Sequence, residues 1–265
     1  FGFLWMASYE GLIRWDGANY KRYFYSRTDS TSLSGNIVYR IFEDHKKRLW
    51  IGTIDGLSLF DREHDRFIRC DLGKETKKIP INDLLQDSKQ RLWLGTSYGL
   101  CLFDPESGHA RWYVHDPLNV NSLSNDIIFR LSIDSSDNLW IATFGGGLNK
   151  FSPESGIFTR FVHEENNPST ICSNKIKSVL VDKTGLVWVG SFDQGLTLLD
   201  AKGNVLRQFR HLTGSNEPIK SDVTCIYEDK NGTIWVGIKG RVLYYKERGS
   251  EDFQPFSNTP FKSPG

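Results

Sequence analysis

The sequence contains little methionine and cysteine, no long apolar run and no excess of charge of either sign. Methionine occurs once, and the four cysteines (Cys70, Cys101, Cys172 and Cys225) show no Cys-x-x-Cys spacing, which excludes the usual zinc and redox motifs. This spacing leaves open whether the thiols stay free or form one long-range disulfide in an oxidising compartment. No apolar run approaches the roughly 18 residues of a membrane-spanning helix.

The balance of charge excludes a second class of function. Lys and Arg together number 33 and Asp and Glu 32, so composition provides no field that would attract nucleic acid or an anionic membrane. We therefore expect no nucleic-acid partner. Glycine is frequent, with 24 residues, and aromatic residues make up 13% of the chain, which favours a turn-rich β structure.

A repeat centred on tryptophan organises the whole chain. Six short apolar segments of the type Leu-Trp-Ile-Gly contain Trp5, Trp50, Trp93, Trp140, Trp188 and Trp235. Successive tryptophans are 45, 43, 47, 48 and 47 residues apart. This period matches a four-stranded blade of a β-propeller, which takes about 40 to 50 residues. No ten-residue stretch has a convincing helical period, so the fold class that we predict is all-β.

Turn signals repeat in phase with the tryptophans. An aspartate stands six residues before five of them: Asp44, Asp87, Asp134, Asp182 and Asp229. A glycine follows each tryptophan by five to seven residues and indicates a second tight turn. Because the architecture requires these residues in every repeat, we interpret the tryptophans as packing between blades and the aspartates as turn residues. The alternatives, a ladder of sugar-stacking indoles and a cluster of carboxylates, are less consistent with the regular spacing.

The strand count predicts six blade units, of which five are complete and the first lacks its inner strand. Their approximate limits are 1–35, 36–78, 79–124, 125–173, 174–220 and 221–257. We expect a single propeller domain over residues 1–265 that is truncated at its C-terminal end. One further strand would close six blades and five would close seven, and seven is the expectation that we favour.

The repeats resemble a known family, the two-component regulator propeller. The resemblance rests on residues 49–61, 92–104 and 139–151, and on the polar linkers at 29–36 and 116–125. The linker at 164–174 is a looser version, and the sixth unit departs most, with Gly-Ile-Lys-Gly-Arg-Val at 237–242. Proteins with this repeat are typically sensor ectodomains of hybrid two-component histidine kinases in gut Bacteroidetes.

The resemblance implies a place in a larger receptor. The chain would be most of the first of two seven-bladed propellers, followed by a small β-sandwich, a membrane helix, the kinase and a DNA-binding output domain. It would face the periplasm as the ectodomain of an inner-membrane protein that forms a homodimer. Its ligand would be an oligosaccharide released from dietary or host glycans, and its partners within the receptor would be the further propeller and β-sandwich domains.

The candidate binding residues lie where the repeats differ. The loops between the second and third strands of each blade combine aromatic side chains, which stack on sugar rings, with polar ones, which bond to sugar hydroxyls. The candidates are Tyr9, Glu10, Asp55, Tyr98, Phe144, Phe192, Asp193, Gln194 and Lys239. Cationic side chains of the outer strands, such as Arg69 and Arg207, are expected to be solvated.

Two alternatives remain open at this point. The propeller could be a structural scaffold while the ligand binds elsewhere in the receptor. A propeller glycosidase or lyase is more remote, because it would need two of the loop carboxylates Glu10, Asp55 and Asp193 to converge although they come from separate blades. We predict no catalytic residue, no metal site and no cofactor.

Overall fold

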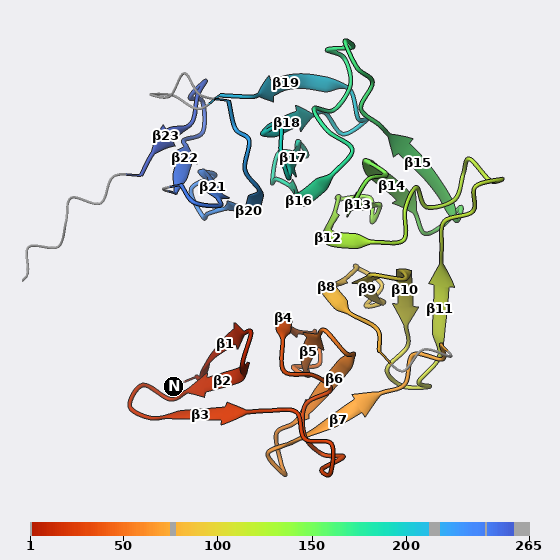
Figure 1. Ribbon diagram of the computed structural model, residues 1–265, viewed down its shortest axis with the longest axis vertical. Helices are drawn as coiled ribbons and strands as arrows, with labels where there is room; N and C mark the ends of the chain where they lie inside the picture. Colours follow the sequence, from red (N-terminus) through yellow and green to blue (C-terminus); the bar gives the residue numbers. More distant parts are fainter. Residues whose placement is uncertain (1, 75–77, 212–217, 242, 257–265) are drawn as a thin grey trace, which may run out of the picture. The chain divides into compact units, whose positions relative to one another are not determined.

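The structure, a computed structural model, describes residues 2–74, 78–211, 218–241 and 243–256. Within these residues the chain forms six antiparallel sheets and no helix (Figure 1). It divides into two compact units, Phe1–Leu131 and Ser132–Gly265, and the division falls inside β12 (Ile128–Ile133), the first strand of the fourth sheet. We refer to these as unit 1 and unit 2.

Unit 1 contains the first three sheets. The first has the order β1-β2-β3, and the second and third are formed by β4 to β7 and β8 to β11 in sequence order. Strand β1 lies beside β4, and β4 and β5 lie beside β8, so neighbouring sheets pack against each other. The strands are β1 (Leu4–Ser8), β2 (Gly11–Trp15), β3 (Tyr20–Tyr23), β4 (Val38–Glu43), β5 (Leu49–Thr53), β6 (Leu57–Asp61), β7 (Arg66–Cys70), β8 (Ile81–Gln86), β9 (Leu92–Thr96), β10 (Gly99–Phe103) and β11 (Ala110–Tyr113).

Unit 2 contains the rest of the fourth sheet and the fifth and sixth sheets. Each again has four strands in sequence order, and β16 lies beside both β13 and β20. The strands that follow β12 are β13 (Leu139–Thr143), β14 (Leu148–Ser152), β15 (Ile157–Phe161), β16 (Ile176–Val181), β17 (Val187–Ser191), β18 (Leu196–Leu199), β19 (Val205–Phe209), β20 (Val223–Glu228), β21 (Ile234–Ile238), β22 (Tyr244–Lys246) and β23 (Gln254–Pro255).

The predicted blade composition is confirmed. One sheet has three strands and five have four, and the short one is the first, which lacks the inner strand. The outer limits of the predicted units, residues 1 and 257, lie outside the described residues. The single truncated domain and the number of blades in the intact domain remain predictions.

Within each unit, a tryptophan strand packs its sheet against the next one along the chain. Trp50 belongs to a buried cluster with residues of the third sheet, and its ring centroid lies 6.0 Å from that of Phe103. In unit 2, Trp188 packs in the same way against the sixth sheet, 5.8 Å from Phe253. Such aromatic pairs stabilise the interface by about 0.5 to 1.5 kcal/mol beyond the area that they bury. Trp50 and Trp188 are therefore core residues at contacts between sheets.

The two terminal tryptophans are only half-buried, in contrast to the four others. Trp50, Trp93, Trp140 and Trp188 are buried, whereas Trp5 and Trp235 keep partial exposure. Strand β1 lacks the inner strand that covers its counterparts, and its residues are accordingly more exposed than those of β5. Trp235 contacts the rings of Tyr245 and Phe256 within its own blade. The burial of this residue thus depends on the neighbouring strand or blade.

The aspartates close the turn before each tryptophan strand and also bond to the indole. Asp44 Oδ1 accepts the main-chain N–H groups of Lys46 and Arg48, each at 2.9 Å. Its Oδ2 accepts Arg48 Nε at 2.6 Å and Trp50 Nε1 at 2.9 Å. The indole bond recurs at 2.8 to 3.0 Å in three other blades, between Asp87 and Trp93, Asp182 and Trp188, and Asp229 and Trp235. One carboxylate thereby satisfies the turn and a buried indole together.

The fourth blade is an exception. Trp140 Nε1 is buried without a hydrogen-bond partner. Asp134 instead accepts the side-chain amide of Asn138 at 3.0 Å and lies 3.2 Å from Lys150 Nζ. The ammonium of Lys150 sits over the Trp140 ring, 5.0 Å from its centroid. Asn138 occupies the position of Arg48, and its side-chain amide donates to both carboxylate oxygens of Asp134.

A glycine is required where the second strand turns into the third. Gly99 has a φ of 109°, and a Cβ there would lie 2.6 Å from the main-chain oxygen of Tyr113 in β11. Gly147 and Gly195 also have positive φ, and a Cβ on either would meet the corresponding oxygen of Phe161 or Phe209. The glycine lets the loop approach the outer strand closely.

Buried charge links the inner strands of unit 1. Asp83 on β8 is 1% exposed, and its Oδ2 accepts the main-chain N–H of Leu131 at 2.8 Å. Its Oδ1 lies 2.8 Å from Arg40 Nε, although that N–H is not aligned for a hydrogen bond, and 3.6 Å from Arg130 Nη1. The carboxylate therefore joins arginines of the preceding and following inner strands.

Candidate functional site

Three linkers between sheets share one folded conformation. They span residues 25–36, 115–126 and 163–174. A side chain at the end of each accepts the first main-chain N–H: Asn36 from Tyr25 at 2.7 Å, Asp126 from His115 at 2.7 Å and Asn174 from His163 at 2.6 Å. A hydroxyl inside each loop (Ser32, Ser122 or Thr170) bonds to main-chain oxygens of the same loop. These linkers are thus preorganised surfaces.

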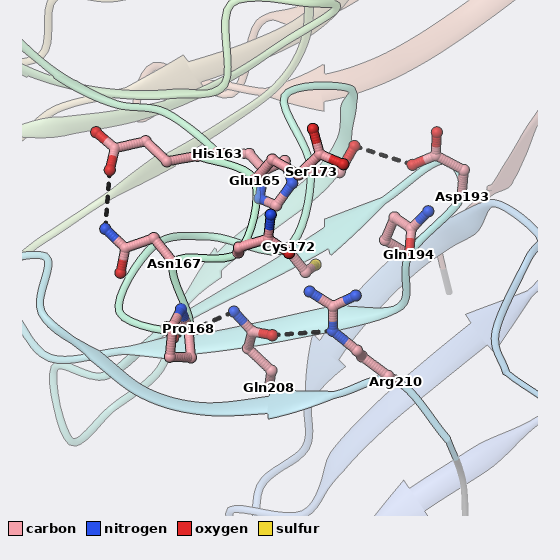
Figure 2. A pocket seen from close by; sticks show the side chains of 12 residues that line it. His163, Glu165, Asn167, Pro168, Cys172, Ser173, Asp193, Gln194, Gln208 and Arg210 are labelled. Atoms are coloured by element: carbon pink, nitrogen blue, oxygen red, sulfur yellow. Dashed lines mark hydrogen bonds between the residues drawn. The ribbon is translucent and has the colours of Figure 1, made fainter.

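In unit 2, the linker and the neighbouring blade enclose a polar pocket of about 610 Å³ (Figure 2). The linker supplies His163, Glu164 and Glu165, the loop between β17 and β18 supplies Asp193 and Gln194, and β19 and its end supply Gln208 and Arg210. Figure 2 shows the bond from Ser173 Oγ to Asp193 Oδ1, 2.9 Å long, and the bond from Arg210 Nε to Gln208 Oε1, 3.0 Å long.

Unit 1 contains a pocket of about 620 Å³ at a similar place. Its linker supplies Tyr25, Arg27 and Ser34, the loop between β5 and β6 supplies Asp55 and Gly56, and β7 supplies Arg69 and Cys70. Lys78, which follows β7, completes the wall, and its Nζ lies 3.2 Å from Asp55 Oδ1. Both volumes lie within the range of about 300 to 1,000 Å³ that is usual for small-molecule sites.

Hydrogen bonds show that the two pockets occupy equivalent positions in their blades. Ser34 N donates to Ser58 Oγ at 3.0 Å, and Cys172 N donates to Thr197 Oγ1 at 3.0 Å. On the outer strand, Arg69 Nε donates to the main-chain oxygen of Ser32 at 3.1 Å, and Gln208 Nε2 donates to that of Thr170 at 2.7 Å. The fold therefore sets the shape of the pocket, and the side chains set its chemistry.

Two of the predicted aromatic residues lie together in unit 2. Phe144, in the loop between β13 and β14, and Phe192, in the loop between β17 and β18, make an edge-to-face contact with centroids 5.1 Å apart. Phe144 is 38% exposed, and the ammonium of Lys177 lies over the Phe192 ring. Because Phe192 precedes Asp193, one loop connects the aromatic pair to the polar pocket. This is the combination of stacking and hydrogen-bonding groups that saccharides require.

In unit 1, the candidates Tyr9 and Asp55 lie near Tyr39, a residue that sequence reasoning missed. The pKa of Tyr39 is raised, first by partial burial and then by the charges of Tyr9 and Asp55. Tyr39 and Lys177 are the extra residues at the same bulge of the inner strand, in β4 and β16. A bulge changes the direction in which the side chain of the extra residue points. In both units, this position therefore contributes to the surface formed by the linkers and by the loops between second and third strands, which we call the loop face.

The remaining candidates lie outside the two pockets. Tyr98 lies at the end of β9, where Lys74 Nζ donates to its main-chain oxygen at 3.1 Å and stands 5.7 Å from its ring centroid. Glu10 lies in the turn between β1 and β2, and Lys239 lies in the loop after β21. The structure therefore brings Asp193 and Gln194 into one pocket and Asp55 into the other. The role of all nine residues in binding stays a prediction.

Sequence reasoning also misjudged Arg69. It is partly buried, and its guanidinium donates to the main-chain oxygens of Ser26, Asp29 and Ser32 at 2.8 to 3.1 Å. Arg69 therefore holds the linker, whereas solvation had been expected. Arg207 is exposed and bonds to Asp252. Arg69 pairs with Ser58 as Gln208 pairs with Thr197, whereas Arg207 is one position earlier on β19 and so points to the opposite face of the strand.

The thiols are unpaired and the metal-binding groups are scattered. All four cysteines are free, and burial raises the pKa of Cys70 and of Cys101 to about 12. The same cause raises the pKa of Cys172 in the unit 2 pocket, so its thiol is a poor nucleophile.

Among the residues that the structure describes, no group of three or more His, Cys, Asp or Glu side chains is placed to hold a metal ion. None of the described segments forms an apolar helix of membrane-spanning length.

A family model described as two component regulator propeller matches residues 32–55, 78–98 and 218–240. These ranges cover inner and tryptophan strands of the second, third and sixth sheets. The resemblance seen in the sequence is confirmed, and it includes the sixth unit, whose motif departs most. No protein of curated function matches the chain.

Solved structures with the same fold include three surface or extracellular proteins. Two are extracellular domains of proteins described as hybrid two-component systems from B. thetaiotaomicron, at 23% and 21% identity and a TM-score of 0.77 each. They cover 96% and 97% of this chain, which covers 35% and 33% of theirs. The third is PorZ, a surface component of the type-IX secretion system of Porphyromonas gingivalis, at 17% identity, a TM-score of 0.69 and coverage of 94% and 37%.

The chain thus spans about a third of the length of these three proteins. Identities this low show the fold alone, a β-propeller of four-stranded antiparallel blades. Proteins with different roles share this fold, so function has to be argued from the loops and pockets of this chain.

Proposed function

Since the chain carries the two-component regulator propeller repeat, we propose that it is part of the sensor ectodomain of a hybrid two-component receptor, located in the periplasm. Its role is to bind an oligosaccharide from glycan breakdown at the loop face of the blades. The partners that we propose are further propeller and β-sandwich domains of the same receptor and a second receptor chain in a dimer.

The observation that carries this proposal is the joining of Phe144 and Phe192 to the polar pocket of unit 2. A sugar ring that stacks on the exposed part of the Phe144 ring would place its hydroxyls near Asp193 and Gln194, which follow Phe192 directly in its loop. Rigid strands and hydrogen-bonded linkers hold these groups, so little conformational entropy is lost on binding.

Binding alone does not transmit a signal. A ligand shifts a receptor between two arrangements only by as much as its affinity differs between them. The loop face therefore has to meet a neighbouring domain in one arrangement more than in the other. We propose this coupling in place of catalysis, because Asp55 and Asp193 line separate pockets and Glu10 lines neither of the two.

Thermal unfolding with a panel of neutral and acidic oligosaccharides tests the proposal. Binding at a hundredfold excess over Kd stabilises the chain by about 2.7 kcal/mol. We expect Phe144→Ala to abolish this stabilisation, since Phe144 contributes exposed aromatic surface for stacking. Ile157→Ala is the matched control, because Ile157 is an exposed apolar residue of the outer strand β15.

Each other outcome contradicts the proposal in its own way. If no oligosaccharide stabilises the chain, the propeller is a scaffold and the ligand binds elsewhere in the receptor. If Ile157→Ala weakens binding as much as Phe144→Ala, the site is not at the loop face. If the protein cleaves a bound oligosaccharide, as chromatography of the mixture would show, the non-catalytic role is wrong.

A further inference from the structure

The two equivalent pockets have opposite charge. Arg27, Arg69 and Lys78 line the unit 1 pocket together with a single carboxylate, that of Asp55. At the same position in unit 2, the lining contains Glu164, Glu165 and Asp193 against one guanidinium. Since the fold gives the two pockets nearly the same volume, the sign of the charge is a property of the side chains alone.

The cations that line the unit 1 pocket outnumber the carboxylates that interact with them. Arg69 donates to three main-chain oxygens and to Ser32 Oγ, all of which are neutral. Asp29 accepts a hydrogen bond from Arg69 with its main-chain oxygen, while its carboxylate Oδ1 accepts from Thr31. The hydrogen bonds from Thr31 lower the pKa of this carboxylate and the charge of Arg69 helps to lower it, so Asp29 offsets part of that charge without a direct side-chain hydrogen bond. Lys78 is paired with Asp55, and its side chain is 76% exposed. The pocket therefore keeps a positive charge.

Arg27 and Tyr25 provide the contacts that remain for a ligand. Arg27 is exposed on the linker and lines the pocket. The Tyr25 ring, 39% exposed, lies under the guanidinium of Arg69 with 5.0 Å between Cζ and the ring centroid. A guanidinium binds the paired oxygens of a carboxylate or sulfate in two parallel hydrogen bonds. The volume of about 620 Å³ leaves room for the sugar ring that bears the anion.

We propose that the unit 1 pocket binds the anionic group, a carboxylate or sulfate, of an acidic saccharide. This inference rests on the proposed function, since it names the chemical class of the ligand for the same loop face. Arg27 binds the anion, Arg69 adds fixed positive charge, and Tyr25 contacts the ring. The opposite charge of the unit 2 pocket disfavours the same anion there, so the two pockets are predicted to differ in ligand.

Calorimetric titration of the 265-residue chain with trigalacturonic acid and with its neutral methyl ester tests the inference. We expect the acid to bind at least about tenfold more tightly than the ester, because a hydrogen bond to a charged group is lost in the ester. A sulfated disaccharide is the second arm and tells whether sulfate is preferred to carboxylate. Affinity for the preferred anion should fall as salt is raised.

Two variants locate the site. Arg27→Gln should weaken binding of the acid by about tenfold or more. Because Arg27 is exposed, misfolding of the variant would not explain such a loss of affinity. Arg210→Gln, in the equivalent pocket of unit 2, should leave the affinity unchanged. Equal affinities for acid and ester, or equal effects of the two variants, would overturn the inference.

The same titrations separate this inference from the function on which it rests. If a neutral oligosaccharide binds while neither acidic probe does, the charge assignment is wrong and the proposed function stands. If no saccharide of either kind binds, both are wrong.

Discussion

The bond between the turn aspartate and the indole can be measured by a double-mutant cycle. In the second blade, Asp44→Ala and Trp50→Phe are made singly and together, and the free energy of unfolding is obtained from urea titrations. The cycle cancels the cavity that Trp50→Phe creates and the turn contacts that Asp44→Ala removes, and it retains the coupling between the two side chains. Both groups are buried, and Nε1 lies 2.9 Å from Oδ2.

The expected coupling follows from the geometry. A buried hydrogen bond to a charged group contributes about 1.5 to 3 kcal/mol, so we expect a value near 2 for this pair. In the fourth blade, the same cycle with Asp134→Ala and Trp140→Phe has no direct bond to remove. The remaining link is Lys150, which contacts both residues and supplies at most about 1 kcal/mol.

Comparison of the two cycles decides whether the reasoning holds. A coupling between Asp44 and Trp50 below about 0.5 kcal/mol, or one equal to that between Asp134 and Trp140, would refute it, since additive pairs agree within this margin. A third cycle with Asp182 and Trp188, whose bond is 2.8 Å long, is expected to reproduce the value of the second blade.

Three further predictions concern stability and reactivity. Burial alone would raise the pKa of Asp44, but hydrogen bonds from Trp50 and Arg48 outweigh this effect, so the pKa is lowered in the folded chain. The contribution of Asp44 to stability should therefore be constant above about pH 5 and decrease as the pH drops below about 4. Urea titrations at several pH values should show a less steep decrease for Asp44→Asn. Asp83→Ala leaves the buried main-chain N–H of Leu131 without its acceptor and removes the carboxylate near Arg40 and Arg130, whose side chains are 40% and 29% exposed. It should cost about 1 to 3 kcal/mol in urea unfolding, and a loss below about 0.5 would contradict the role assigned to this carboxylate. Exposed Cys225 should react with a thiol reagent before Cys101 and Cys172, and mass spectrometry of the native protein that shows the reverse order would be incompatible with the burial described here.

Local regularity made the strands predictable. The tryptophan period fixed the second strand of each blade, and the polar turn before it fixed the end of the first. For the fourth unit this reasoning gives Leu139 to Thr143, which is the observed β13. The indole bond to the aspartate was not predicted, because spacing alone does not tell which of its oxygens faces the next strand. The departure at Trp140 was not predicted either, because the position of Asn138 is Leu186 or Thr233 in blades that keep the indole bond.

The pockets were less accessible from the sequence because they are formed by segments far apart in the chain. The loop residues Asp55 and Asp193 were selected as variable positions and do line pockets. Arg69 and Gln208 were not selected, since outer strands are usually solvated. Their inward direction depends on the folded linkers, whose main-chain oxygens they bind. Only a prediction of the linker conformation would have indicated them.

Hydrogen exchange of the chain with and without trigalacturonic acid tests most directly whether recognition occurs at the linkers and loops. We predict slower exchange in residues 25–36 and 54–57, which contribute Arg27 and Asp55 to the unit 1 pocket. The turn at 44–48 lies at the other end of β5 and should be unchanged. Protection confined to that turn, or to the outer strands, would contradict the account.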